Sequence, residues 1–277
     1  MTATPIPRTL AMTLYGDLDV SVMDEMPAGR KPIKTYHQDE ALRLRMYGFI
    51  REQIAKGRQA YIVYAIIEES ETLDYKNLVQ GFETLKTVFP QPKYMLSILH
   101  GRMNAKEKEY QMEMFRSGKS QIMVATTVIE VGVDVPNAAL MVIESAERFG
   151  LAQLHQLRGR VGRGAEQSYC ILMTSGRLSE VAFRRMKTME QTNDGFKIAE
   201  VDLELRGPGD IQGTRQSGAL NLKIANIAAD AQLLDLTRSE AVKLFKDDHD
   251  LSLKENAVLK NYIEENLQQA KFWSSVS

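Results

Sequence analysis

The sequence predicts an α/β fold in which a parallel sheet carries helices on both faces. Two patterns favour this architecture. Between residues 38 and 174, short apolar segments rich in β-branched residues alternate with longer segments of helical periodicity, which is typical of repeated strand–helix–strand units. The segment 61–67, Tyr-Ile-Val-Tyr-Ala-Ile-Ile, is apolar throughout, as expected of a strand buried on both faces of a parallel sheet.

Each element follows from its own pattern. The first helix places apolar residues at helical spacing and ends at Lys56-Gly57, a basic last turn followed by a helix-terminating glycine. The later segments repeat the alternation of strand and helix. The predicted elements, in order, are a helix over 38–56, a strand over 61–67, a helix over 72–89, a strand over 94–99, a helix over 104–117, strands over 121–126 and 139–143, a helix over 151–158 and a strand over 168–173.

Other patterns flank this core. The beginning of the chain predicts a short helix within residues 4–14, a strand over 19–23 and a turn at 27–29. After residue 174 we expect helices over 178–191, 226–246 and 254–270, with a glycine-rich loop from Arg206 to Gly218 between the first two. The expected divisions of the chain are 1–29, 30–174, 175–225 and 226–277.

The composition limits the class of protein. The chain has 277 residues, 44% of them hydrophobic and 26% charged, which is enough apolar material for a sizeable core. A single cysteine, Cys170, excludes an intramolecular disulfide, and the four histidines show no zinc-ligand spacing, so we expect no metal site. No apolar run approaches the ~20 residues that span a bilayer, so we expect an intracellular protein without a membrane partner.

The net charge of −1 argues against a nucleic-acid partner when taken alone, but the charge is unevenly distributed. Four arginines and no acidic residue lie between Arg148 and Ala165. Guanidinium groups bind phosphate through paired hydrogen bonds, and Gly159 and Gly162 weaken the helix that carries these arginines. A solvated arginine-rich helix would not need those glycines. We therefore interpret the segment as a phosphate site.

A second polar segment, 124–136, reads Val-Ala-Thr-Thr-Val-Ile-Glu-Val-Gly-Val-Asp-Val-Pro. It begins as a buried strand, and ligands of open α/β sheets bind at the carboxyl ends of strands. Thr126 is therefore a candidate contact for a nucleic-acid phosphate and Asp134 for a ribose hydroxyl. The alternative is a structural Asp-x-Pro turn.

These segments together resemble the superfamily 2 helicases. The stretch Gln156-Leu-Arg-Gly-Arg-Val-Gly-Arg163 resembles their motif VI, Ala125-Thr126 through Gly132-Val-Asp134 resembles motif V, and Leu99-His-Gly-Arg102 resembles the segment between motifs IV and V. Residues 2–8, Thr-Ala-Thr-Pro-Ile-Pro-Arg, resemble motif III, which closes the first RecA-like motor domain. All four occur in the family order. The resemblance implies that the parallel sheet is the second RecA-like motor domain, followed by a helical hairpin and a C-terminal helical extension.

The glycine-rich stretch narrows the resemblance. Leu205-Arg-Gly-Pro-Gly-Asp210 and Gly213-Thr-Arg-Gln-Ser-Gly218 are similar to the translocation motif shared by the RecG family and the transcription-repair coupling factors. The sequences of the segment 149–158 and of Gly-Thr-Arg-Gln-Ser-Gly resemble the RecG family more than the coupling factors. A coupling factor stays open as an alternative, as does a non-catalytic nucleic-acid-binding module.

The resemblance implies a role for each matching residue. Gln156, Arg160 and Arg163 would face ATP, with the two arginines acting as arginine fingers, and Gly132 and Asp134 would line the sugar of the nucleotide. Other matching residues would contact DNA. They are Thr126, His100, Gly101 and Arg102 on the motor domain and Arg206, Arg215 and Gln216 in the translocation loop.

The sequence lacks other parts of a helicase. Gly118-Lys-Ser120 is no phosphate-binding loop, because Glu113 stands where the first glycine is required and the segment follows a helix. Asp24-Glu25 follows the motif III-like segment, whereas the acidic Mg²⁺-binding box precedes it in the family. We therefore expect a C-terminal piece of a longer helicase, with 1–29 as the end of the first motor domain, and no ATPase activity from this chain alone.

For the complete protein, the resemblance implies ATP and Mg²⁺ as cofactors and branched double-stranded DNA as the partner. It also implies an N-terminal wedge domain, a monomeric state and work in recombination and repair in the bacterial cytoplasm, at the nucleoid.

Overall fold

The structure, a computed structural model, describes residues 30–65, 71–126, 135–210 and 231–264. The elements predicted within residues 4–29 lie outside the described residues. The described residues belong to two compact units, the first containing those between 30 and 210 and the second those between 231 and 264. Among the described residues, no helix is long and apolar enough to cross a bilayer.

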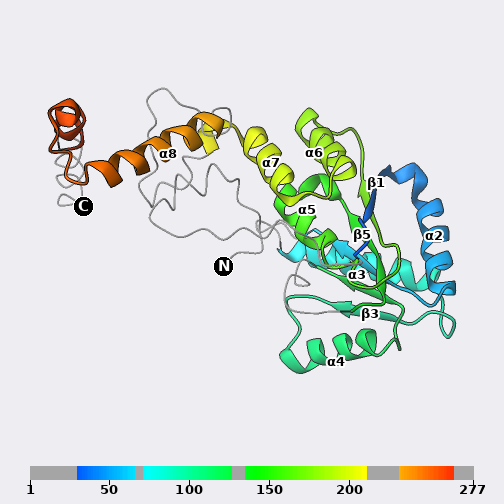
Figure 1. Cartoon of the computed structure of the whole chain (residues 1–277). Helices are drawn as coiled ribbons and strands as arrows, with labels where there is room; N and C mark the ends of the chain where they lie inside the picture. The colour runs from blue at the N-terminus through cyan, green and yellow to red at the C-terminus, as the bar shows by residue number, and fades with distance from the viewer. Residues whose placement is uncertain (1–29, 66–70, 127–134, 211–230, 265–277) are drawn as a thin grey trace. The chain divides into compact units, whose positions relative to one another are not determined.

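The first unit is built on one six-stranded parallel sheet (Figure 1). The strand order is β1-β6-β5-β2-β4-β3. The strands are β1 (Lys34–Asp39), β2 (Gln59–Tyr64), β3 (Leu96–Leu99), β4 (Ile122–Ala125), β5 (Ala138–Glu144) and β6 (Tyr169–Thr174). Every residue of β4 and of β5 is buried, as the apolar runs predicted.

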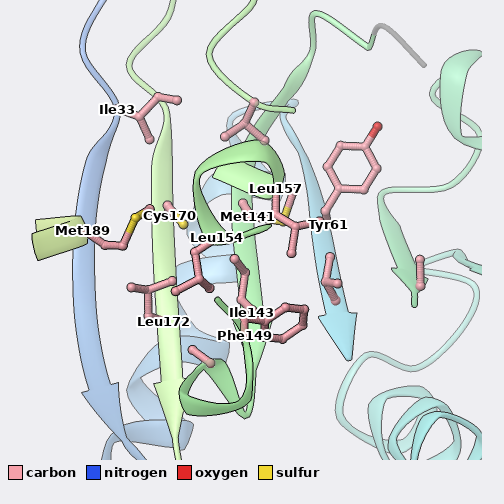
Figure 2. Packing of buried hydrophobic residues seen from close by; sticks show 14 of the residues in the cluster. Ile33, Tyr61, Met141, Ile143, Phe149, Leu154, Leu157, Cys170, Leu172 and Met189 are labelled. Carbon is pink, nitrogen blue, oxygen red and sulfur yellow. The ribbon is translucent and has the colours of Figure 1, made fainter. Parts of the chain in front are cut away.

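Helices cover both faces of this sheet, which confirms the predicted fold class. One face packs against α2 (Arg43–Ala55) and α3 (Glu71–Val88), whose buried residues include Ile50 and Leu85. The other face packs against α4 (Ala105–Arg116), α5 (Leu151–Arg158), α6 (Glu180–Gln191) and α7 (Gly195–Asp210). Figure 2 shows this second core, in which side chains of α5 and α6 meet those of β5 and β6: Leu154, Leu157, Met189, Met141, Ile143, Cys170 and Leu172.

The start of the predicted first helix is wrong. Residues 38 and 39 belong to the strand β1, and a short 3₁₀ helix over Glu40–Leu42 precedes α2. β1 pairs with β6 in register from Lys34 opposite Tyr169 to Asp39 opposite Thr174. β1 is an edge strand in which only Thr35 is buried, and its sequence, Lys-Thr-Tyr-His-Gln-Asp, carries no apolar run.

The predicted glycine-rich loop is also wrong in its first part, because α7 continues to Asp210 and includes Arg206. Ile198, Val201 and Leu205 of α7 join the core beneath α5 and α6. This packing holds the first part of α7, and the helix continues through the glycines and the proline of its last turn despite their low helix propensity. The rest of the predicted loop, 211–218, lies outside the described residues.

The second unit contains α8 (Ala231–Asp247), a 3₁₀ helix over Lys254–Asn256 and a helix that begins at residue 257. The Asp248 carboxylate accepts hydrogen bonds from the main-chain N–H groups of Ser252 and Leu253, at 2.8 and 3.0 Å, and from the Asn256 amide at 2.8 Å. This arrangement fixes the turn between the helices and lowers the pKa of Asp248 to about 2.

Candidate functional site

Four of the predicted DNA-contacting residues lie together at the carboxyl ends of two neighbouring strands. β3 ends at Leu99 and β4 at Ala125, and the main-chain N–H of Thr126 donates to the carbonyl of Leu99 at 3.1 Å. His100 follows Leu99 in the chain and therefore lies beside Thr126. Gly101 and Arg102 are exposed in the turn that comes next. The Thr126 hydroxyl is buried and has no hydrogen-bond partner among the described residues. We refer to His100, Gly101, Arg102 and Thr126 as the carboxyl-edge group.

Local capping fixes the turn of the carboxyl-edge group. Asn104 caps the N-terminus of α4, and Asn104 and Glu107 form a reciprocal capping box. The Lys108 ammonium donates to the carbonyl of Gly101 at 3.1 Å. Partial burial, with the positive charge of Arg102 beside it, lowers the pKa of His100, so the imidazole is mostly neutral at pH 7.

The arginine-rich segment lies at the opposite edge of the sheet. α5 follows β5 and packs back along the sheet, so that it ends beside the amino ends of the strands. Residues 159–164, which we name the arginine loop, follow α5 and carry Arg160 and Arg163. Arg163 is exposed, whereas Arg160 and Gln156 are half-buried.

Glycine geometry holds the arginine loop in place. Gly162 has φ +79°, in the left-handed region, and a Cβ there would lie 2.9 Å from Cγ1 of Ile33. A Cβ on Gly164 would lie 2.6 Å from the carbonyl oxygen of Pro136. Ile33 directly precedes β1 and Pro136 precedes β5, so both contacts place the loop at the amino edge. Close approach is therefore found at Gly162, one of the two glycines that the sequence singled out, and at Gly164, which it did not. At Gly159, the other one, a Cβ would meet only the carbonyls of Gln156 and His155 in its own helix.

The segment 124–136 consequently reaches both edges. Thr126 lies at the carboxyl end of β4, as predicted, but Pro136 lies at the amino side of β5, next to the arginine loop. The polar loop between them, 127–134, which the sequence placed at the carboxyl ends of the strands, lies outside the described residues. Gly132 and Asp134 lie outside the described residues.

Arg158 changes the interpretation of the four clustered arginines. Its side chain is 1% exposed, and its guanidinium donates to the carbonyls of Met189 and Thr192 at 2.9 and 2.8 Å. Burial lowers the pKa of Arg158. This arginine joins α5 to the end of α6 and is not available to a phosphate. Sequence reasoning gave no sign of this, since Arg158 stands within the same polar run as Arg160.

His155 completes the same buried contact. Its Nδ1 lies 3.1 Å from the Arg158 guanidinium, and we assign Nδ1 as the acceptor because a guanidinium can only donate. Burial, together with the charge of Arg158, lowers the pKa of His155 to about 4. The ring is therefore neutral at pH 7.

A partly buried ion pair lies at the carboxyl edge, at the end of β5. Arg43 makes two parallel hydrogen bonds to the Glu144 carboxylate, at 2.7 and 2.8 Å, and also pairs with Glu40. Burial and the negative charge of Glu144 raise the pKa of Tyr64. Sequence reasoning missed this pair, because Arg43 and Glu144 are far apart in the chain and neither stands in a motif.

The remaining predicted site residues lie beyond these two groups. Arg206 is in the last turns of α7, and its side chain is not among those described. Arg215 and Gln216 lie outside the described residues. The structure thus brings His100, Gly101, Arg102 and Thr126 together at one edge and Gln156, Arg160 and Arg163 together near the other.

Two family models match the chain. Residues 45–165 match the helicase conserved C-terminal domain, and residues 192–277 match the C-terminal part of domain 3 of the ATP-dependent DNA helicase RecG. The first match includes the arginine loop and the strands β3 and β4, which precede the carboxyl-edge group. The second includes α7 and α8.

Curated relatives agree with these matches. The chain is 49% identical over 261 residues to the ATP-dependent DNA helicase RecG of Bacillus subtilis, covering 94% of this chain and 38% of the relative. It is 52% identical over 252 residues to the protein of the same name from Synechocystis, covering 91% of this chain and 30% of the relative. The chain therefore spans well under half the length of these relatives.

A solved structure of RecG bound to a three-way DNA junction is similar to this chain, with a TM-score of 0.66 and 46% identity. That similarity covers 85% of this chain and 30% of the solved one.

Proposed function

Since the chain belongs to the RecG family of helicases, whose C-terminal part it matches, we propose that it is the C-terminal motor part of an ATP-dependent helicase acting on branched DNA. The single observation that carries this proposal is the geometry of the arginine loop. Two glycines with close backbone contacts hold Arg160 and Arg163 on a fixed turn at the sheet's amino edge.

The donor set of the arginine loop fits a nucleotide phosphate. Guanidinium groups stay charged at all physiological pH values and present paired donors that match phosphate oxygens. In this proposal Arg160 and Arg163 stabilise the negative charge that develops during phosphoryl transfer, and Gln156 orients the reacting groups. ATP with Mg²⁺, when bound, supplies the phosphoryl group and its leaving group. We further propose that Gly132 and Asp134 line the sugar.

The carboxyl-edge group suits a DNA backbone. Arg102 is exposed and supplies the positive charge, while the neutral His100 ring supplies hydrogen bonds. We also propose Thr126 as a DNA contact; its hydroxyl is buried and has no hydrogen-bond partner among the described residues. Such contacts position a duplex without reading its sequence. We assign Arg206, Arg215 and Gln216 to the same partner, within a translocation segment.

Further parts of the proposal concern the complete protein. We propose that its first motor domain carries the phosphate-binding loop and acidic box absent from this sequence, so that this chain alone hydrolyses no ATP. We retain 1–29, 30–174, 175–225 and 226–277 as the divisions of the chain. We also propose that the complete protein is monomeric, carries an N-terminal wedge domain and acts on nucleoid DNA in the bacterial cytoplasm.

The test uses this chain joined to the proposed first motor domain of the complete protein. Arg163→Ala should lower the DNA-stimulated kcat for ATP by about 10³-fold, the usual effect of an arginine finger, and leave DNA affinity nearly unchanged. Arg148→Ala is the matched control, because Arg148 is exposed but precedes α5. Hydrolysis that survives Arg163→Ala would show that the finger assignment is wrong.

A further inference from the structure

The segment that leads into β1 lies alongside the arginine loop. The Arg30 Nε donates to the carbonyl of Gly162 at 2.8 Å. Two more hydrogen bonds follow in the same direction along both segments: the Gln167 side-chain amide donates to the carbonyl of Pro32 at 2.8 Å, and the Lys34 N–H donates to the carbonyl of Ser168 at 3.1 Å. Arg30 and Pro32 are therefore bonded to Gly162 and Gln167 ahead of the sheet pairing of β1 with β6, which begins at Lys34.

The Arg30 side chain binds the arginine loop at Gly162, the residue with a left-handed backbone. Gly162 stands between Arg160 and Arg163, and its left-handed backbone, with φ +79°, sets the direction in which Arg163 leaves the loop. Ile33 packs against the Cα side of Gly162, while Arg30 binds its carbonyl. The peptide unit at Gly162 is thus held from two sides by the same short segment.

We propose that Arg30 is a positioning residue for the arginine loop, acting through the Gly162 carbonyl. The inference rests on the proposed function, because the loop is taken to face a nucleotide phosphate. Hydrogen bonds from a charged donor are stronger than those between neutral groups, and this one is only partly exposed to water. Without it, the peptide plane at Gly162 rotates more freely and Arg163 samples directions away from the phosphate.

Positioning makes a specific kinetic prediction. A small misplacement of a group that acts in the transition state lowers kcat, whereas loss of a direct ground-state phosphate contact raises KM. A role for Arg30 through Gly162 therefore predicts a fall in kcat with little change in KM for ATP.

The experiment has two readouts. In the 277-residue chain, hydrogen exchange at the arginine loop is measured for the unsubstituted protein, Arg30→Met, which keeps the length of the stem but removes the donors, and Arg30→Lys, which restores a charged donor. In the chain joined to its phosphate-loop motor domain, kcat and KM for ATP are measured for the same three proteins. Arg51→Met is the matched control, since Arg51 also donates to a carbonyl, that of Val88 at 3.0 Å, on the other face of the sheet.

We expect Arg30→Met to speed exchange in the arginine loop and to lower kcat by about 10-fold to 100-fold, with KM within about twofold. Arg30→Lys should recover part of both losses, and Arg51→Met should change neither. Unchanged exchange, unchanged kcat, or a rise in KM at constant kcat would each overturn the positioning role. Absence of hydrolysis in the unsubstituted joined protein would instead overturn the proposed function, and the exchange measurement on the chain would still report whether Arg30 holds the loop.

Discussion

The α-carbon of Gly164 lies against the carbonyl oxygen of Pro136, so closely that a Cβ at position 164 would be 2.6 Å from that oxygen. This contact fixes the end of the arginine loop against the residue that follows the proposed sugar-binding segment. Two stretches that the sequence separates by more than twenty residues are therefore held as one surface.

Gly164→Ala should disturb that surface. The Pro136 oxygen belongs to the backbone and has little room to withdraw, so we expect the free energy of unfolding to fall by about 1–3 kcal/mol, the usual cost of overpacking. Chemical denaturation of the chain measures this. Gly48→Ala is the control, because no atom lies within 4 Å of a Cβ at that position in α2 and the substitution should be neutral or stabilising. Equal stability of Gly164→Ala and the unsubstituted chain would contradict the close contact.

Arg158→Met should destabilise the fold and leave phosphate contacts alone. The substitution leaves the buried carbonyls of Met189 and Thr192 without their donor. We expect a loss of about 1–3 kcal/mol, partly offset because a buried charge is removed at the same time. Thermal unfolding checks this, with the exposed Arg148→Met as control. A stability gain would mean that desolvation of the guanidinium costs more than its hydrogen bonds return.

The strands and helices of the motor domain could be predicted largely from local patterns, and the exceptions share one physical cause. The helix over 151–158 was predicted to the residue, and the buried strands were within a few residues of their bounds, because burial on both faces leaves an apolar run. β1 was not predicted, because this edge strand is stabilised by its pairing with β6 and has no apolar run of its own. α7 was missed for a related reason, since contacts with α5 and α6 hold it despite its glycines.

The candidate site was predictable in its residue types but not in its arrangement. Motif spacing selected Thr126, Arg160 and Arg163, whereas only the parallel topology assigns them to opposite edges of the sheet. Burial of Arg158 and the bond from Arg30 to Gly162 depend on segments distant in the chain, which no local pattern encodes. The roles of all these residues stay predictions.

His155 should make stability depend on pH in a defined window. Its pKa is about 4 in the folded chain and about 6.5 when unfolded, so between these values the unfolded state binds the additional proton. Stability is therefore fully retained above pH 6.5 and falls as the pH drops towards 4, by about 2 kcal/mol after allowance for partial exposure. Denaturation of the chain at pH 7.5 and pH 5 measures the loss. His155→Asn, which keeps an acceptor but does not titrate, should show a smaller loss, and identical losses would refute the assignment.

Arg102 and His100 should affect DNA binding in different ways, because only one of them is charged at pH 7.5. Burial and the neighbouring Arg102 keep the pKa of His100 below its ordinary value, so the ring binds a phosphate without releasing a counterion. Arg102→Ala should reduce the slope of log affinity against log salt concentration by about 1, whereas His100→Gln should weaken binding and leave the slope unchanged. Fluorescence anisotropy with a labelled forked duplex measures both the affinity and the slope, at salt concentrations from about 50 to about 200 mM. Arg116→Ala is the control, since Arg116 is an exposed arginine at the far end of α4, paired with Glu113. A slope that falls as much for Arg116→Ala as for Arg102→Ala would show that DNA contacts the domain through general surface charge and not through the carboxyl-edge group.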